Sequence, residues 1–188
     1  FGTLFFDYDL DGRPDYLQAN GHLELEINQV QPSQTYQQSA QLFWNAGNEV
    51  KRTFVEVGSD ATGDLAHPIV GRGCSTADLD VLLTQSGGKP VLLRNEQKLG
   101  QHWLRVRLTA KGKNHAAIGA RVEVFVNGVK QCQDAVPFKS YLSQCERTLT
   151  FGLGAATKID KLVVSWPDGA HQELAALAAD RVHDVRQE

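Results

Sequence analysis

The chain has 188 residues, of which 41% are apolar and 22% charged, so it can bury a core and disorder is not expected. It contains no methionine and begins at Phe1, which suggests a fragment or a processed product whose signal peptide, if it had one, has been removed. No apolar run approaches the roughly 18 residues that cross a bilayer, and the sequence therefore predicts no membrane span.

Charge is distributed unevenly between the two halves of the chain. Residues 1–94 carry 6 Lys and Arg against 12 Asp and Glu, whereas residues 95–188 carry 13 against 10. This asymmetry favours two domains, which we place at residues 1–95 and 96–188. The basic residues of the second half are scattered rather than clustered, so we expect no nucleic-acid partner.

Strand-like segments dominate the chain, and helical periodicity is nearly absent. Short runs rich in β-branched and aromatic residues, separated by turn residues, predict an all-β protein. Asn127-Gly128 predicts a type I′ hairpin turn, and the one helix candidate, the alanine-rich stretch 173–180, is either a helix or a turn with a single helical coil. The expected strands are residues 2–6, 15–19, 41–45, 53–58, 90–95, 102–108, 120–126, 129–136, 140–144, 148–153, 161–166 and 181–186.

An acidic stretch, DYDLDGRPD, follows the first expected strand. Four ionised carboxylates within nine residues repel one another unless a cation neutralises them. Acidic residues at positions 1, 3 and 5, with Gly12 at position 6 for the bend, match the oxygen cage of a calcium loop, in which position 7 contributes a carbonyl. The predicted metal ligands are Asp7, Asp9, Asp11, the backbone carbonyl of Arg13, and Asp15.

The flanks of this loop indicate a β-hairpin rather than an EF-hand. Gln18 stands where an EF-hand has glutamate, and both neighbouring segments read as strands. The fourth carboxylate is instead Asp15 at position 9, which gives the shorter pattern D-x-D-x-D-G-x-x-D. Hard oxygen donors without nearby His or Cys favour Ca²⁺ over a transition metal, and a solvated acidic turn is the alternative.

A weak internal repeat covers the first half. The segment that starts with GTLFFDYDLDG and ends at Asn45 resembles the segment that starts with GCSTADLDVLL and ends at Asn95. Repeated small antiparallel units are typical of propeller blades, and two are too few to close a ring. In the second copy, Asp78 and Asp80 align with the start of the acidic loop, but its remainder is missing. Either that loop has been lost or, as we favour, a segment is absent between two strands.

The three cysteines show no zinc-binding spacing. An expected bend near residues 139–140 would bring Cys132 and Cys145 opposite each other. A cross-strand disulfide, which implies an oxidising compartment, and two buried thiols are the two interpretations. Cys74 is interpreted as a small packed residue.

The sequence contains no signature of catalysis. We find no HExxH, no G-x-S-x-G and no P-loop. Paired carboxylates can hydrolyse glycosides, but a metal explains the acidic loop better, and it would occupy the oxygens that acid–base chemistry needs. Trp103 and Trp166 close a core if buried and could stack on sugar rings if exposed. We therefore predict that the chain is not an enzyme.

At the level of families, the first half resembles FG-GAP/VCBS calcium repeats, the blades of integrin-α-like propellers. This resemblance rests on FFDYDLDGRPDYLQANGH, QLFWNAG and GRGCSTADLD. The second half resembles the ASPIC/UnbV domain through HWLRVRL, NHAAIGARVEVFVNG, SYLSQ, FGLGAATKIDKLVVSWPDG and ADRVHDVRQE. The combination is similar to the C-terminal part of the cartilage acidic protein-like family. The shortened second loop and the cysteine pair depart from the family pattern.

The resemblance implies a fold, a location and a role. The implied fold is a partial β-propeller followed by a β-sandwich-like ASPIC/UnbV domain, in a protein that is secreted, extracellular or, in a bacterium, periplasmic. The implied role is a calcium-binding recognition or adhesion module whose partners are an extracellular protein or glycan, together with the remaining propeller blades of a longer chain. The alternative is a non-catalytic accessory end of a larger secreted enzyme.

Overall fold

The computed structural model describes residues 2–49, 51 and 53–188. It is 44% strand and 4% helix, which confirms the predicted all-β class. The chain forms two compact units, which we describe separately. The first unit contains the described residues up to Tyr8, those of Pro14–Glu96, and Phe138–Cys145. The second unit contains Asp9–Arg13, Gln97–Pro137 and Glu146–Glu188.

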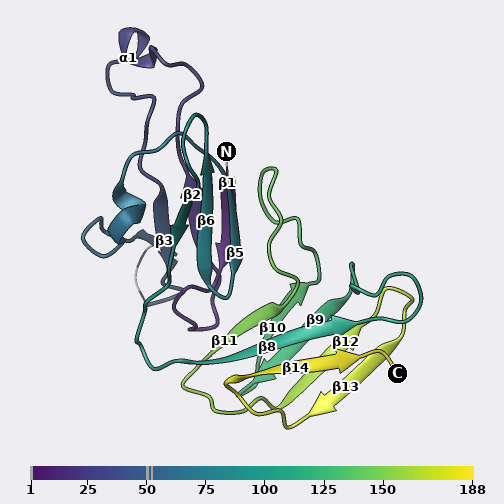
Figure 1. Cartoon of the computed structure of the whole chain (residues 1–188). Helices are drawn as coiled ribbons and strands as arrows, with labels where there is room; N and C mark the ends of the chain where they lie inside the picture. The colour runs from purple at the N-terminus through teal and green to yellow at the C-terminus, as the bar shows by residue number, and fades with distance from the viewer. Residues whose placement is uncertain (1, 50, 52) are drawn as a thin grey trace. The chain divides into compact units, whose positions relative to one another are not determined.

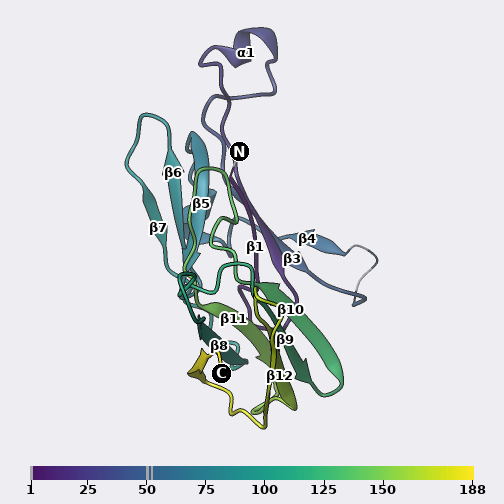
Figure 2. The ribbon, with the colours of Figure 1, turned by 90° about the vertical axis from the view of Figure 1, so that its right-hand side faces the viewer.

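The first unit is built from two antiparallel sheets (Figure 1). One sheet has the order β1 (Gly2–Phe6), β2 (Asp15–Ala19), β3 (Gln41–Asn45) and β4 (Phe54–Glu56). The other has the order β5 (Gly71–Ala77), β6 (Asp80–Gln85) and β7 (Val91–Leu93). Figure 2 gives the side view in which β4 and β7 are visible. In both sheets, strands adjacent in sequence are adjacent in space, as in simple meanders.

Alternation along the strands places one face of the first sheet in a core and leaves aromatic rings on the other. Leu4 and Leu17 are 1% exposed and share a core with Leu83 of β6. Because successive side chains of a strand point to opposite faces, Phe5 and Tyr16 lie on the other side, with ring centroids 5.1 Å apart. Phe5 is 58% exposed, so this aromatic face meets solvent in the described structure.

The second unit also consists of two sheets (Figure 1). One has the order β10 (Val129–Asp134), β9 (Arg121–Val126), β12 (Lys161–Ser165) and β13 (His171–Ala175). The other has the order β11 (Leu149–Gly154), β8 (His102–Thr109) and β14 (Arg181–Arg186), with β14 parallel to β8.

Side chains from both sheets of the second unit form one core. Val124 and Leu162 from one sheet and Phe151 from the other are at most 1% exposed. Trp166 is 3% exposed and belongs to this core, as expected if it closes the core. Trp103 is half-buried.

The predicted type I′ turn joins β9 to β10. Val126 pairs with Val129, and the two residues between them have φ angles of 49° at Asn127 and 78° at Gly128. Positive φ at both central positions is what a type I′ turn requires, and it strains most residues other than glycine and asparagine. This hairpin prediction is confirmed.

Two expectations about secondary structure were wrong. Residues 140–144 form no strand but a single bridge between Ser140 and Ser143. They belong to Phe138–Cys145, a segment that is part of the first unit although the residues before and after it belong to the second. We call this segment the excursion. The stretch 173–180 is not helical, since its start lies in β13, whose pairing with β12 outweighs the helix propensity of alanine.

Among the described residues, helical structure is limited to two short segments. The connector 21–40 between β2 and β3 carries the one-turn helix α1 (Ile27–Val30), which has no buried residue. A 3₁₀ turn spans Gly63–Ala66. Within the described part of the chain, no helix is long and apolar enough to cross a membrane.

Candidate metal centre

The acidic loop is the connection between β1 and β2. The hairpin's last pair is Phe6 with Asp15, and the chain turns between them. Leu10 has a φ of 65° and Gly12 a φ of 93°. Gly12 therefore adopts the left-handed conformation expected of the glycine in a tight oxygen-ligand loop.

Three of the four predicted carboxylates converge. One carboxylate oxygen from each of Asp7, Asp9 and Asp15 lies within 4.8 Å of the others. Asp9 is 6% exposed and Asp15 is fully buried, while Asp7 is half-buried. Negative groups this close and this shielded from water repel each other more strongly than surface charges do. We call these three residues the aspartate cluster.

Asp15 also fixes the loop to its neighbouring strand. Its Oδ2 accepts a hydrogen bond from the backbone N–H of Tyr8 at 3.0 Å. Its Oδ1 accepts one from the backbone N–H of Asn45, at the end of β3, at 2.8 Å. A carboxylate oxygen has two lone-pair sites, so these bonds leave capacity for a cation. Asp15 therefore holds the backbone in place and faces the other two carboxylates.

Asp11, the fourth predicted ligand, lies outside the aspartate cluster. Its Oδ1 accepts the backbone N–H of Arg13 at 2.7 Å, and its Oδ2 lies 2.5 Å from Nη2 of the same arginine. Burial raises the pKa of Asp11, as does the charge of Asp9, whereas the backbone N–H and guanidinium of Arg13 lower it. Arg13 thus supplies a counter-charge to one carboxylate, and its predicted role as a carbonyl ligand stays a prediction.

The second copy of the repeat has a different turn. Ala77 pairs with Asp80, and the two residues between them, Asp78 and Leu79, have φ angles of 54° and 68°. This is a two-residue hairpin turn in which both central residues have positive φ. Asp78 and Leu79 therefore supply the turn between β5 and β6 that the sequence analysis did not find, and the expectation of an absent segment stays a prediction.

Asp80 corresponds to Asp15 rather than to the start of the acidic loop. Each is the first residue of the second strand of its sheet. Oδ1 of Asp80 accepts the backbone N–H of Asn95 at 2.8 Å, as Oδ1 of Asp15 does from Asn45. Both copies keep this Asp–Asn clamp, and only the first has the metal-type loop. The sequence contained a signal for this correspondence, because both copies end in asparagine. The sequence analysis instead aligned Asp78 and Asp80 with the start of the acidic loop.

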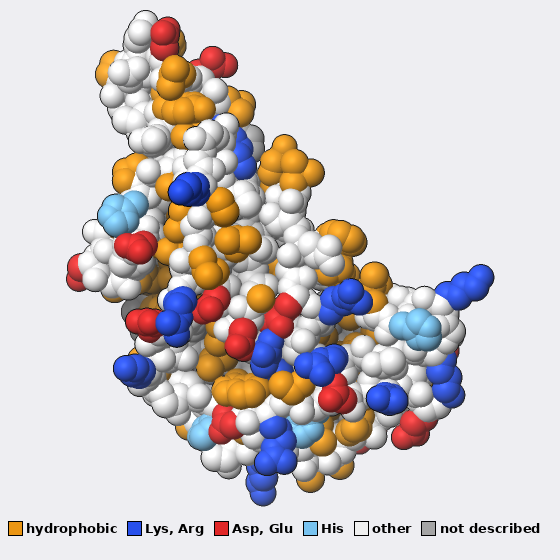
Figure 3. Space-filling model, in the orientation of Figure 1, with side chains coloured by type: hydrophobic (Ala, Val, Ile, Leu, Met, Phe, Trp, Pro, Cys, Tyr) orange, Lys and Arg blue, Asp and Glu red, His pale blue; other side chains and the backbone are white. Residues whose placement is uncertain are grey.

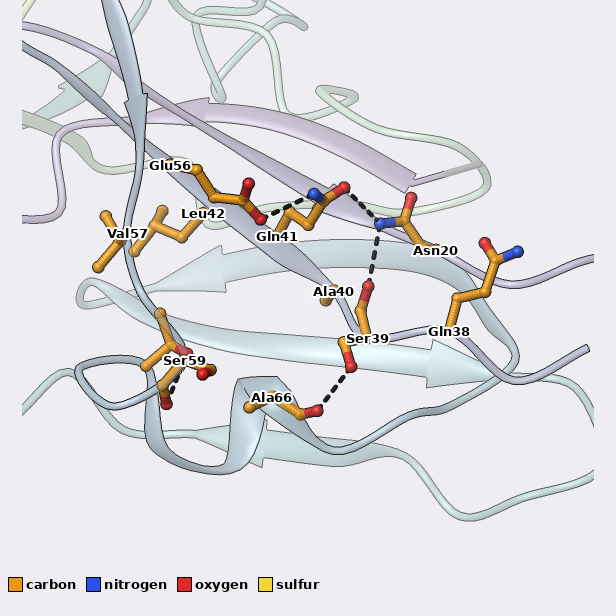
Figure 4. Close-up of a pocket in the computed structure, with 11 residues that line it drawn as sticks. Asn20, Gln38, Ser39, Ala40, Gln41, Leu42, Glu56, Val57, Ser59 and Ala66 are labelled. Carbon is orange, nitrogen blue, oxygen red and sulfur yellow. Dashed lines mark hydrogen bonds between the residues drawn. The ribbon is translucent and has the colours of Figure 1, made fainter. Parts of the chain in front are cut away.

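A polar cavity of about 330 Å³, which sequence reasoning missed, lies in the first unit (Figure 4). Nδ2 of Asn20 donates to the backbone oxygen of Ser39 and to Oε1 of Gln41, both at 3.0 Å. Nε2 of Gln41 in turn donates to Oε1 of Glu56 at 2.8 Å. These bonds hold the amide and carboxylate groups of the cavity wall in fixed orientations.

The fold and this loop define an all-β protein with an acidic hairpin loop. Compared with known families, residues 110–188 match the model of the family described as ASPIC and UnbV. The match covers β9 to β14 and confirms this part of the resemblance found in the sequence. The resemblance of the first half to FG-GAP/VCBS repeats stays a prediction. The comparison with curated proteins found no significant match.

Proposed function

We propose that this chain is a non-catalytic, calcium-stabilised binding module of a protein that is extracellular or, in a bacterium, periplasmic. The observation that carries the proposal is the aspartate cluster in the β1–β2 connection. The metal's role here is structural: by binding the folded loop it cancels the repulsion among the carboxylates.

The spacing of the oxygens supports Ca²⁺ as the ion. Calcium takes six to eight oxygen ligands at about 2.3–2.6 Å, so ligands on opposite sides of one ion are roughly 5 Å apart. Three carboxylate oxygens within 4.8 Å of each other fit that range. Asp7, Asp9 and Asp15 would hold the ion. The spacing of the loop adds Asp11 and the Arg13 carbonyl as further ligands, in which case calcium competes with the Arg13 guanidinium for Asp11.

The two sheets of the first unit support an interpretation as FG-GAP/VCBS-like propeller blades. Each is a small antiparallel meander, and the two repeat the Asp–Asn clamp. Phe5 and Phe54, whose ring centroids are 6.4 Å apart, leave an aromatic face of the kind that a further blade of a longer chain would cover. The two sheets of the second unit, which share one core, support a β-sandwich-like ASPIC/UnbV domain.

Two features of the first unit are suited to a partner. In the connector 21–40, Leu23, Leu25 and Val30 are 66%, 71% and 85% exposed. Figure 3 shows hydrophobic side chains over the part of this unit that carries α1. The polar cavity beside Gln41 and Glu56 offers oriented hydrogen-bonding groups, which a glycan requires. An extracellular protein would use the first feature, and a glycan the second.

Terbium luminescence tests the metal site. Tb³⁺ is a hard ion that occupies oxygen sites, and excitation of Tyr8 in the loop sensitises its emission. We expect emission that is displaced by Ca²⁺ at far lower concentration than by Mg²⁺, because Mg²⁺ demands a near-octahedral site and dehydrates reluctantly. Asp9→Asn should abolish the emission, and Asp78→Asn in the β5–β6 turn should leave it unchanged. Equal emission from Asp9→Asn and the parent chain would rule out the site.

A glycan array tests the polar cavity. We expect glycan binding by the calcium-loaded chain to fall at least tenfold in Glu56→Ala, which removes the acceptor of Gln41, and to be unchanged in Glu24→Ala, an exposed carboxylate of the connector. Binding that persists in Glu56→Ala, or that Leu25→Ser abolishes instead, would exclude the cavity as the recognition site.

A further inference from the structure

Two of the three cysteines lie in the same core. Cys74 in the middle of β5 is fully buried, and Cys145 is 4% exposed. Both belong to the core of the first unit, although they are far apart in sequence. Cys132 is exposed on β10, and no Cys132–Cys145 disulfide is formed, so the first of the two interpretations is not met. The second, two buried thiols, holds for Cys145 and fails for Cys132. The three thiols are free in the structure.

The excursion Phe138–Cys145 packs directly on β5. Sγ of Cys74 lies 3.1 Å from Oγ of Ser140. A Cβ atom added to Gly73 would lie 3.0 Å from the backbone oxygen of Tyr141 and 2.6 Å from Oγ of Ser143, so only glycine admits the approach. The excursion therefore touches β5 at consecutive positions just before Cys145 enters the core.

We propose that Cys74 and Cys145 form a disulfide when the chain folds in an oxidising compartment, and that this bond ties the excursion to β5. The oxidant is a small-molecule or protein disulfide. Each cysteine thiol loses its proton, one S–S bond forms between Cys74 and Cys145, and the S–S bond of the oxidant breaks to give two thiols. Two electrons pass from the cysteine pair to the oxidant, so the exchange balances.

Burial decides when this exchange takes place. Burial raises the pKa of the Cys74 thiol, and the nearby Cys145 acts in the same direction. A thiol kept protonated and away from solvent reacts slowly, because the thiolate is the attacking species. The bond therefore forms while the chain folds and is afterwards shielded from reductants. Cys132 is exposed, so it reacts with alkylating reagents whether Cys74 and Cys145 are reduced or joined by a disulfide.

Peptide mapping without reduction tests the bond, since trypsin places each cysteine in its own peptide: residues 73–94, 131–139 and 140–147. After folding in a glutathione redox buffer and alkylation, we expect peptide 73–94 joined to peptide 140–147. Before alkylation, the intact mass should be about 2 Da lower than that of the reduced chain, for the two lost hydrogens. The same link should form in Cys132→Ser. A link between 131–139 and 140–147, or alkylation of all three cysteines, would overturn the proposal.

A stability measurement keeps the test independent of variants that fold poorly. A bond that closes a loop of about 70 residues restricts the unfolded chain, so refolding Cys132→Ser from denaturant in dithiothreitol instead of the redox buffer should lower its Tm by roughly 5–10 °C. In Cys145→Ser, which cannot form the bond, reduction should leave the Tm unchanged. Equal shifts in the two variants, or no shift in either, would contradict a Cys74–Cys145 bond.

Discussion

Replacing Asp15 with alanine is expected to destabilise the first unit by about 3–5 kcal/mol in the presence of EDTA, because two charge-assisted hydrogen bonds to this buried residue are lost. The backbone amides of Tyr8 and Asn45 both donate to this carboxylate. Each such bond contributes about 1.5–3 kcal/mol, and relief of repulsion from Asp7 and Asp9 offsets part of the total. Urea unfolding of Asp15→Ala beside the parent chain measures the effect.

The matching residue of the second copy provides the control. Asp80 is half-buried and accepts the Asn95 amide in the same way, so Asp80→Ala should cost only about 1 kcal/mol. Hydrogen exchange adds a local measure, since the Tyr8 and Asn45 amides should lose protection in Asp15→Ala and keep it in Asp80→Ala. Equal losses of stability in the two variants would show that Asp15 does not hold the loop as described.

Calcium is expected to raise the Tm of the chain by roughly 5–10 °C relative to EDTA. A ligand present at 100 times its Kd stabilises the folded state by about 2.7 kcal/mol, and each kcal/mol shifts the Tm of a chain of this size by about 2–4 °C. In Asp9→Asn the response should be absent, because one of the three converging carboxylates is gone. Differential scanning calorimetry with saturating CaCl₂ and with EDTA gives both values.

The effect of Asp9→Asn on the free energy of unfolding should change sign when the metal is removed. With calcium the variant is less stable than the parent chain, because it lacks a ligand. In EDTA it should be at least as stable, since removing one negative charge reduces the repulsion within the aspartate cluster. Asp78→Asn keeps a residue that tolerates positive φ and should respond to calcium like the parent chain. A variant equally destabilised with and without calcium would show that Asp9 acts only in packing.

Local signals accounted for most of the strands. Alternation of apolar and polar residues predicted β1, β2 and β9, and Asn127-Gly128 predicted the turn after β9, because these features depend only on neighbours in sequence. The convergence of Asp7, Asp9 and Asp15 was predictable for the same reason: their spacing and Gly12 determine the bend.

Features that depend on distant contacts could not be predicted. Strand β5 contains two glycines and two small polar residues, so its pattern is weak, and its pairing with β6 decides the conformation. The course of Phe138–Cys145 into the first unit depends on close packing at Gly73, which no local pattern reports. Asp11 lies outside the aspartate cluster and pairs with Arg13, which spacing alone does not predict, because it does not determine which counter-charge a carboxylate contacts.

Isothermal titration of Ca²⁺ into the metal-free chain tests the central claim most directly. We predict a single binding event with one ion per chain, which disappears in Asp9→Asn and persists in Asp78→Asn. No binding to the parent chain, or identical binding to Asp9→Asn, would contradict the assignment of the β1–β2 connection as a calcium site.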